Sequence, residues 1–259
     1  MAPPAAPSAS PWGYVKYEKI SAVVYRGSDY KIYELSLAND GWHWQNLFYW
    51  TPNPVPPATD PVAYVTGYYK NAVVYVGVDQ HVHQLEWSGN DEDGWQQRDL
   101  TQSAGAPLAS VSTRPTTFVS SQGTTVAYTG ANGHICLLYF ADGQLNWFYK
   151  DPNPNPTTAS LALTSPLAYK RYDNYYSIVY GGNNNDLYEL ASMDAYNWWP
   201  YDLSTTAGGT GWIGPGDPAA YVRSDGCNSV VFTQAFSYYI EELTLCPGGS
   251  WQSWSLGSH

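Results

Sequence analysis

The sequence predicts an all-β fold, a five-bladed β-propeller with four antiparallel strands in each blade. The first observation is a fivefold repeat, whose copies each begin with a proline and a short strand, at Pro11, Pro61, Pro115, Pro166 and Pro218. The intervals are 50, 54, 51 and 52 residues. The second observation is that each copy holds four short segments rich in Val, Ile, Tyr and Trp, separated by Gly, Asn, Asp and Ser. Four-strand repeats of roughly 40–50 residues are typical of propeller blades.

The four strands of each copy are recognised in the same order. The first follows the proline, as in WGYV and VAYV, and the second is apolar: AVVYRG, AVVYVG, TVAYTG, SIVYGG and SVVFTQ. Such strands are apolar on both faces, which predicts burial between two neighbouring sheets. The third strand is KIYEL, HVHQL, HICLL, DLYEL or IEEL, and the fourth is led by a tryptophan: Trp42, Trp95, Trp147, Trp198 and Trp251. No segment combines a clean helical period with helix caps.

Five periods of about 52 residues account for nearly all of the 259 residues. We therefore expect a Pro/Ala-rich leader over 1–10 and a single propeller domain over 11–259. The repeats are about 11–60, 61–114, 115–165, 166–217 and 218–259. The last copy lacks the long connector that follows the others, as expected of a terminal blade in a chain that closes on itself.

Composition narrows the class of partner. Aromatic residues make up 16% and charged residues 13% of the chain, whereas globular domains carry about 25% charged residues. The net charge of −11 and the absence of basic patches argue against nucleic acid and anionic membranes as partners. No apolar run is long enough for membrane insertion. The first residues lack the basic and apolar regions of a signal peptide. We nevertheless expect the protein to be secreted or to act at the cell surface.

An enzyme is the first alternative. Glycosidases need two or three convergent carboxylates, yet the first strands, which we expect to line the central channel, contain no Asp or Glu. Asp60 and Asp217 lie just before the proline in two copies, and Glu18 follows the first strand in one copy only. No nucleophile, metal or phosphate motif is present, so we expect no catalytic residues, no metal and no cofactor. A protein-binding propeller scaffold is the second alternative.

The chain contains three cysteines. Cys227 and Cys246 fall in the first and third hairpin loops of copy five, which share one face of a four-stranded meander. A disulfide between them and two free thiols are both compatible with this placement. Cys136 lies within a strand and is expected to be a buried apolar residue.

One polar position recurs within the otherwise apolar third strand. It is occupied by Glu34, Gln84, Glu189 and Glu242, and by Leu137 in copy three. Each polar residue is followed 8–11 residues later by the tryptophan of the fourth strand. One interpretation is structural, because a buried carboxylate needs hydrogen-bond partners in neighbouring blades. The other is a sugar site, since hydroxyl groups pair with carboxylates and amides while sugar C–H faces stack on aromatic rings. The candidate sugar-binding residues are Glu34, Trp42, Gln84, Trp95, Glu189, Trp198, Glu242 and Trp251.

The segments VVYRGSDYKIYEL and VVYVGVDQHVHQLEW, with W-x-x-x-DLT and AGAPLA, resemble the repeats of the Photorhabdus-type β-propeller lectins. More remotely, the chain is similar to the Aleuria-type fucose-specific lectins. The resemblance implies a multivalent lectin with sugar sites between blades, for fucose and O-methylated sugars. We expect fucose or a methylated sugar as the first ligand, with N-acetylglucosamine or galactose next. The Aleuria type carries an Arg in the second strand, where this chain has Ala22, Ala72, Ser177 and Ser229.

Overall fold

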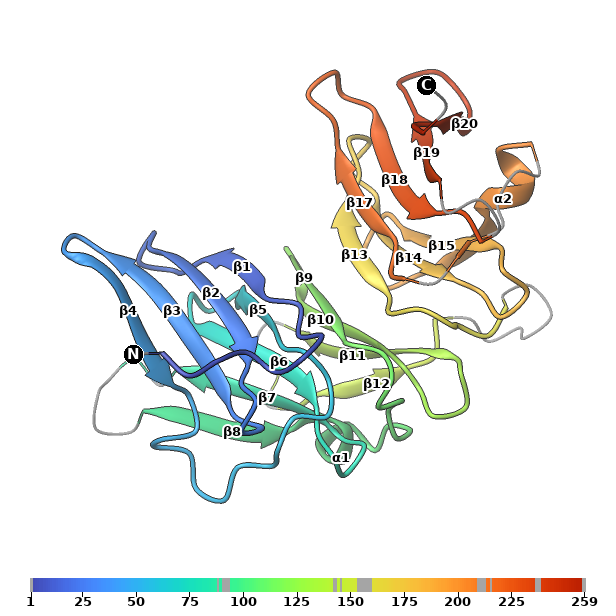
Figure 1. Ribbon diagram of the computed structural model, residues 1–259. Helices are drawn as coiled ribbons and strands as arrows, with labels where there is room; N and C mark the ends of the chain where they lie inside the picture. The colour runs from blue at the N-terminus through green and yellow to red at the C-terminus, as the bar shows by residue number, and fades with distance from the viewer. Residues whose placement is uncertain are drawn as a thin grey trace. The chain divides into compact units, whose positions relative to one another are not determined.

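The computed structural model describes residues 2–87, 89, 94–141, 144, 146–152, 160–208, 213–214, 216–235 and 239–257. These residues form five four-stranded antiparallel sheets and two short helices (Figure 1). The chain divides into two compact units, Met1–Val126 with Leu138–Lys150, and Ala127–Leu137 with Asp151–His259. None of the helices in the described part of the chain has the length and apolar character needed to cross a membrane.

The first two sheets lie in the first unit and follow the chain as simple meanders. The first consists of β1 (Trp12–Val15), β2 (Ser21–Arg26), β3 (Ile32–Ala38) and β4 (Gly41–Asn46). The second consists of β5 (Val62–Val65), β6 (Asn71–Val76), β7 (Val82–Trp87) and β8 (Trp95–Asp99), and the helix α1 (Leu100–Ala104) follows it. The third sheet has the order β12 (Phe148–Lys150), β11 (Ile135–Ala141), β10 (Gly123–Thr129) and β9 (Thr116–Ser120).

The fourth and fifth sheets belong to the second unit and repeat the same order. The fourth consists of β13 (Leu167–Lys170), β14 (Tyr176–Gly181), β15 (Leu187–Ser192) and β16 (Trp199–Asp202), and the helix α2 (Leu203–Thr206) follows it. The fifth consists of β17 (Ala219–Val222), β18 (Asn228–Thr233), β19 (Ile240–Leu245) and β20 (Gln252–Ser255). The two one-turn helices are an element that the sequence analysis did not anticipate. Each begins at an aspartate, Asp99 or Asp202, whose side chain accepts a backbone N–H of the first turn.

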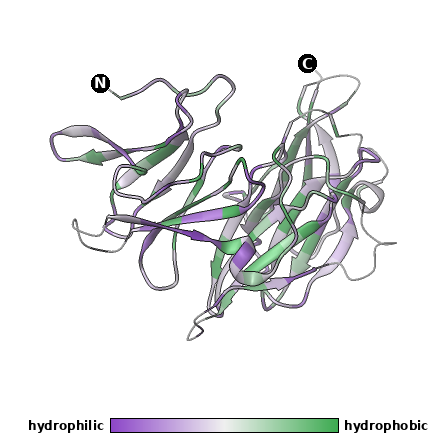
Figure 2. Cartoon of the chain, turned by 90° about the horizontal axis from the view of Figure 1, so that it is seen from below, coloured by the Kyte–Doolittle hydropathy of each residue, from purple (hydrophilic) through white to green (hydrophobic). Residues whose placement is uncertain are grey.

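The sheets stack through their second and third strands. In the first unit, Val24 and Ile32 of the first sheet pack against Val73, Tyr75 and Leu85 of the second. A matching cluster in the second unit joins the fourth and fifth sheets. Figure 2 shows hydrophobic residues along the strands of the sheets. Within each unit the first strands are neighbours, β1 beside β5, β5 beside β9, and β13 beside β17. The first strands of consecutive sheets therefore lie beside one another within each unit.

The Pro/Ala segment before the first strand is held by the first sheet. The Tyr25 hydroxyl donates to the Pro3 carbonyl, and the Ala6 amide donates to the Arg26 carbonyl. Ala5 forms a bridge with Gly27, in the same way that the connectors of later copies bridge Gly77, Gly182 and Gln234. This segment thus plays the part of a connector instead of lying outside the fold. A side chain at Gly27 would place its Cβ 2.6 Å from the Tyr33 ring, so the glycine lets the chain turn tightly there.

Candidate functional site

Strand register decides which tryptophan can meet each glutamate. Glu34 of β3 lies opposite Gln45 of β4, whereas Trp42 lies opposite Leu37. Leu37 is three residues from Glu34, and side chains an odd number apart point to opposite faces of a strand. The glutamate and the leading tryptophan of one copy therefore face opposite sides of their sheet. A glutamate can therefore share a pocket with the leading tryptophan of a different copy, and not with that of its own.

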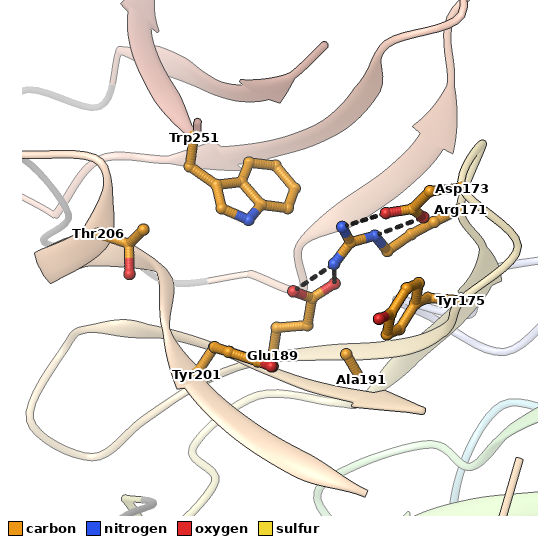
Figure 3. A pocket seen from close by; sticks show the side chains of 8 residues that line it. All are labelled: Arg171, Asp173, Tyr175, Glu189, Ala191, Tyr201, Thr206 and Trp251. Atoms are coloured by element: carbon orange, nitrogen blue, oxygen red, sulfur yellow. Dashed lines mark hydrogen bonds and ion pairs between the residues drawn. The ribbon is translucent and has the colours of Figure 1, made fainter. Parts of the chain in front are cut away.

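The second unit contains such a pocket, with a volume of about 280 Å³. Glu189 of β15 lies at its base, and Trp251, which precedes β20 in the following copy, lies above it (Figure 3). Arg171, which directly follows β13, extends its guanidinium between them. The structure thus brings Glu189 together with Trp251 and does not bring it together with Trp198, the tryptophan of its own copy.

Arg171 is fixed by two carboxylates. Its Nε and Nη2 donate to the two oxygens of Asp173 at 3.1 and 2.7 Å. Its Nη1 donates to both oxygens of Glu189, at 3.3 Å to Oε1 and 3.1 Å to Oε2. The guanidinium lies 5.2 Å from the Tyr175 ring centroid and 5.9 Å from that of Trp251, within cation–π range.

The ion pair is almost fully removed from water. Side-chain exposure is 10% for Arg171 and 1% for Glu189. Burial raises the pKa of Glu189 above its ordinary value, and the Arg171 charge and the Ser177 hydroxyl offset part of that rise. Burial acts to lower the pKa of Arg171, but the Glu189 and Asp173 carboxylates outweigh it and the pKa is raised. The Ser177 hydroxyl donates to Glu189 at 2.6 Å, so a serine occupies the position where the Aleuria type carries its arginine.

The first copy contains a related but more closed arrangement. Lys16 donates to Glu34 Oε1 at 2.9 Å, and Ser36 and Gln45 each donate to the same oxygen at 2.8 Å. The Tyr14 hydroxyl donates to Oε2, and burial together with the Glu34 charge raises the pKa of that tyrosine. A carboxylate accepts about four hydrogen bonds. Glu34 is therefore largely satisfied by its own sheet.

The fifth copy repeats the pattern of the fourth. Arg223 lies with its Nη2 2.7 Å from Asp225 Oδ2 and its Nη1 3.5 Å from Glu242 Oε2. The Ser229 hydroxyl donates to Glu242 at 2.6 Å. An Arg-x-Asp sequence after the first strand and a serine in the second strand therefore accompany the glutamate in both copies.

The second copy departs from this arrangement. Gln84 replaces the glutamate, and the carboxylate of Glu86 pairs with Lys70 at 2.8 Å and lies 3.9 Å from Arg98. Trp147 of the following copy lines the cavity beside Gln84, but its volume is about 20 Å³. That is close to the space of a single water, so this site is filled by its own side chains.

The cation that pairs with the glutamate was not predicted, although the sequence contains a signal for it. The residue five positions after the leading proline is Lys16, Thr66, Ser120, Arg171 or Arg223 in the successive copies. The copies with a cation at this position are those with a glutamate in the third strand, and the copies with Thr or Ser have Gln or Leu there. Comparing the first and third strands of each copy would have revealed the pair.

The remaining candidate residues are placed as follows. Trp95 is buried beside Trp87 in the first unit, 5.9 Å between ring centroids. Trp42 is 55% exposed on the face of β4 that points away from Glu34. A disulfide joins Cys227 and Cys246, and Cys136 is buried in β11.

The carboxylates considered for catalysis each have a structural contact. Asp60 accepts from the Arg26 side chain and the Ser10 amide. Glu18 accepts from the Asn71 side chain at 3.0 and 3.3 Å, and Asp217 accepts the Ser165 amide at 2.7 Å. Their contacts hold connectors and neighbouring strands together.

Comparison with known proteins places the fold. No family model matches the chain, and no curated protein matches it. Among solved structures, the lectin BP39L from Burkholderia pseudomallei superimposes with a TM-score of 0.69 at 14% identity, covering 97% of this chain and 71% of that one. Aleuria aurantia lectin, described as a six-bladed β-propeller with a fucose recognition mode, gives 0.63 at 15% identity, covering 97% and 77%. The lectin SapL1 in complex with α-methyl fucoside gives 0.60 at 14% identity, covering 100% and 81%. The chain therefore has a β-propeller fold.

Proposed function

We propose that this protein is a lectin, a non-enzymatic carbohydrate-binding protein, and that the pocket of Arg171, Glu189 and Trp251 binds an α-fucoside. The observation that carries the proposal is the buried ion pair, which is open on one side beneath a tryptophan in a cavity of about 280 Å³. Sugar hydroxyls can accept from the guanidinium and donate to the carboxylate. The C–H face of the sugar can stack on the indole ring. The likeness to lectins described with fucose or fucosides supports fucose as the first ligand to test.

The charges of the pocket favour a neutral sugar. One guanidinium faces the two carboxylates Asp173 and Glu189, so the lining carries an excess of negative charge. An anionic sugar would bring a further negative charge into a partly desolvated site, which is unfavourable. Together with the net charge of −11, this supports neutral deoxy or O-methylated hexoses over sialylated ones.

Calorimetric titration with methyl α-L-fucoside tests the proposal. The expected result is binding that is lost at one site in Arg171→Met and kept in Arg26→Met, because Arg26 pairs with Asp60 away from the pocket. Sialyllactose should not bind. A glycan array that includes methylated sugars would define the preference. Failure of every neutral glycan to bind at high protein concentration would overturn the lectin proposal, and release of reducing sugar would indicate an enzyme.

The repeat also supports a five-bladed propeller. The described residues form five sheets with the same strand order, and the five copies share one register of proline, glutamate position and tryptophan. We propose that each sheet is one blade of a single domain. Class averages from electron microscopy should show five blades; six blades, or two separate particles, would contradict this.

A further inference from the structure

A second pocket, of about 290 Å³, lies in the first unit and has a different chemistry. Five aromatic side chains line it: Tyr33, Trp44, Tyr49, Trp50 and Trp95. Two amide side chains, Gln45 and Asn46, complete the lining. The lining residues include no charged side chain, in contrast to the pocket of Arg171 and Glu189. A ligand held here must be recognised by stacking and by neutral hydrogen bonds.

Two aromatic residues of this pocket, Tyr49 and Trp50, are specific to the first copy. In the second copy the turn after the fourth strand is α1, with the sequence Leu-Thr-Gln-Ser, and in the fourth copy it is α2, with Leu-Ser-Thr-Thr. The first copy has Leu-Phe-Tyr-Trp at the same place, residues 47–50. Small polar residues suffice for the turn itself, so the architecture does not require this aromatic pair.

The turn holds its two outer aromatic side chains in place at the surface. Tyr49 is 71% exposed and Trp50 is 58% exposed, and their rings meet edge to face with centroids 4.6 Å apart. The buried Thr51 hydroxyl lies 2.9 Å from the Leu47 carbonyl and 3.0 Å from the Trp95 carbonyl, which ties the turn to β8. Large exposed aromatic side chains on a fixed turn are costly in water unless a ligand covers them.

The two amides are neighbours on β4, so their side chains point to opposite faces of the strand, Gln45 with Glu34 and Asn46 with Tyr33. The Gln45 nitrogen donates to Glu34 at 2.8 Å, which leaves its oxygen as an acceptor. The Asn46 oxygen accepts from the Phe48 amide at 2.9 Å, which leaves its nitrogen as a donor. An acetamido group offers a carbonyl acceptor and an apolar methyl, so it matches the Asn46 nitrogen and the aromatic side chains on the same face, Tyr33 and Trp44.

We infer that this aromatic pocket is a second carbohydrate site, which binds an N-acetylated amino sugar independently of the arginine pocket. The sugar ring would stack on Trp50, its acetamido carbonyl would accept from the Asn46 nitrogen, and its methyl would contact Trp44, which lies on the same face of β4 as Asn46. The volume is near the lower end of the range of about 300–1,000 Å³ for small-molecule sites, which suits one or two sugar rings. A chain with both sites would recognise two different sugars and gain avidity on a multivalent target.

The test titrates the full chain with methyl N-acetyl-β-D-glucosaminide and, separately, with methyl β-D-glucoside and methyl α-L-fucoside. We expect the N-acetylated glycoside to bind and the glucoside to bind at least about tenfold more weakly, because it lacks the acetamido contacts. Trp50→Ala should weaken the N-acetylated glycoside at least about fivefold through lost stacking. Phe148→Ala is the matched control, an aromatic residue of the same unit that is 48% exposed outside the pocket.

The two proposals fail separately. Trp50→Ala should leave fucoside binding unchanged, and Arg171→Met should leave the N-acetylated glycoside unchanged. If the wild-type chain does not bind methyl α-L-fucoside, the proposal for the arginine pocket is overturned and the second site is not affected. Equal affinity for glucoside and N-acetylated glycoside would overturn the acetamido assignment. No binding of the N-acetylated glycoside, or no effect of Trp50→Ala in a folded variant, would overturn the second site.

Discussion

Removing Arg171 should destabilise the second unit more than removing the charge of Glu189. Arg171→Met leaves Glu189 at 1% exposure with no cation beside it, and breaking a buried ion pair in this way costs about 3–5 kcal/mol. Glu189→Gln leaves Arg171 with its two hydrogen bonds to Asp173. Its cost is the loss of charged hydrogen bonds, about 1.5–3 kcal/mol.

The loss of stability in Arg171→Met relative to wild type should become smaller as the pH falls. Burial already raises the pKa of Glu189 above its ordinary value of 4.5, and Arg171 limits the rise. Without the arginine the folded-state pKa rises further, so the penalty is full above that pKa. It shrinks as the pH falls through that raised pKa toward 4.5, because the folded-state carboxyl is then protonated and uncharged, and it is gone below 4.5, where the unfolded-state carboxyl is protonated as well. The deficit of Arg171→Met relative to wild type should therefore shrink between pH 7 and pH 4.5.

Urea unfolding followed by tryptophan fluorescence measures both effects, with Arg26→Met as the control for loss of a partly buried arginine. The reasoning is refuted if Arg171→Met and Glu189→Gln lose the same free energy of unfolding at pH 7. It is also refuted if the deficit of Arg171→Met is the same at both pH values.

Three further predictions concern other contacts. Trp251→Ala should weaken methyl α-L-fucoside about 2- to 12-fold, the equivalent of about 0.5–1.5 kcal/mol of ring contact, while Trp198→Ala should leave the affinity unchanged; calorimetry showing the reverse would place the site elsewhere. Cys227→Ser should lower the stability of the last sheet by about 3 kcal/mol, because the disulfide closes a separation of 19 residues; an unchanged melting temperature would contradict this. Gly94→Ala should lower stability and N-acetylated glycoside binding, because Gly94 has φ +57° and an added Cβ would lie 2.5 Å from Trp50 Cβ; wild-type affinity in this variant would count against a fixed Trp50.

The strands and their order could be predicted from the sequence alone. The apolar second strands, the tryptophan-led fourth strands and the turn residues recur in register, and the structure shows four strands in the same order in every copy. The two one-turn helices escaped notice because periodicity cannot reveal an element of four or five residues. Their aspartate caps, Asp99 and Asp202, were the available signal.

The candidate site was predicted in part. The recurring polar position in the third strand was identified, and Glu189 does line a pocket beneath a tryptophan. The tryptophan comes from the next copy, because strand alternation turns the side chain of Trp198 to the other face. Arg171 was not predicted because it follows the first strand, about 18 residues before Glu189 in the sequence. Only the joint occurrence of a cation and a glutamate in the same copies indicates the pair.

The sequence by itself determined the repeat, the strand order and the residue types available to a site, because these follow from local pattern and from the two-residue period of a strand. Tertiary structure decided which side chains meet. The Arg171–Glu189 pair lies under Trp251 because two sheets stack face to face, and the aromatic pocket exists because Trp50 is fixed against the following sheet at Gly94. Such contacts depend on the packing of separate copies, which no pattern within a single copy contains.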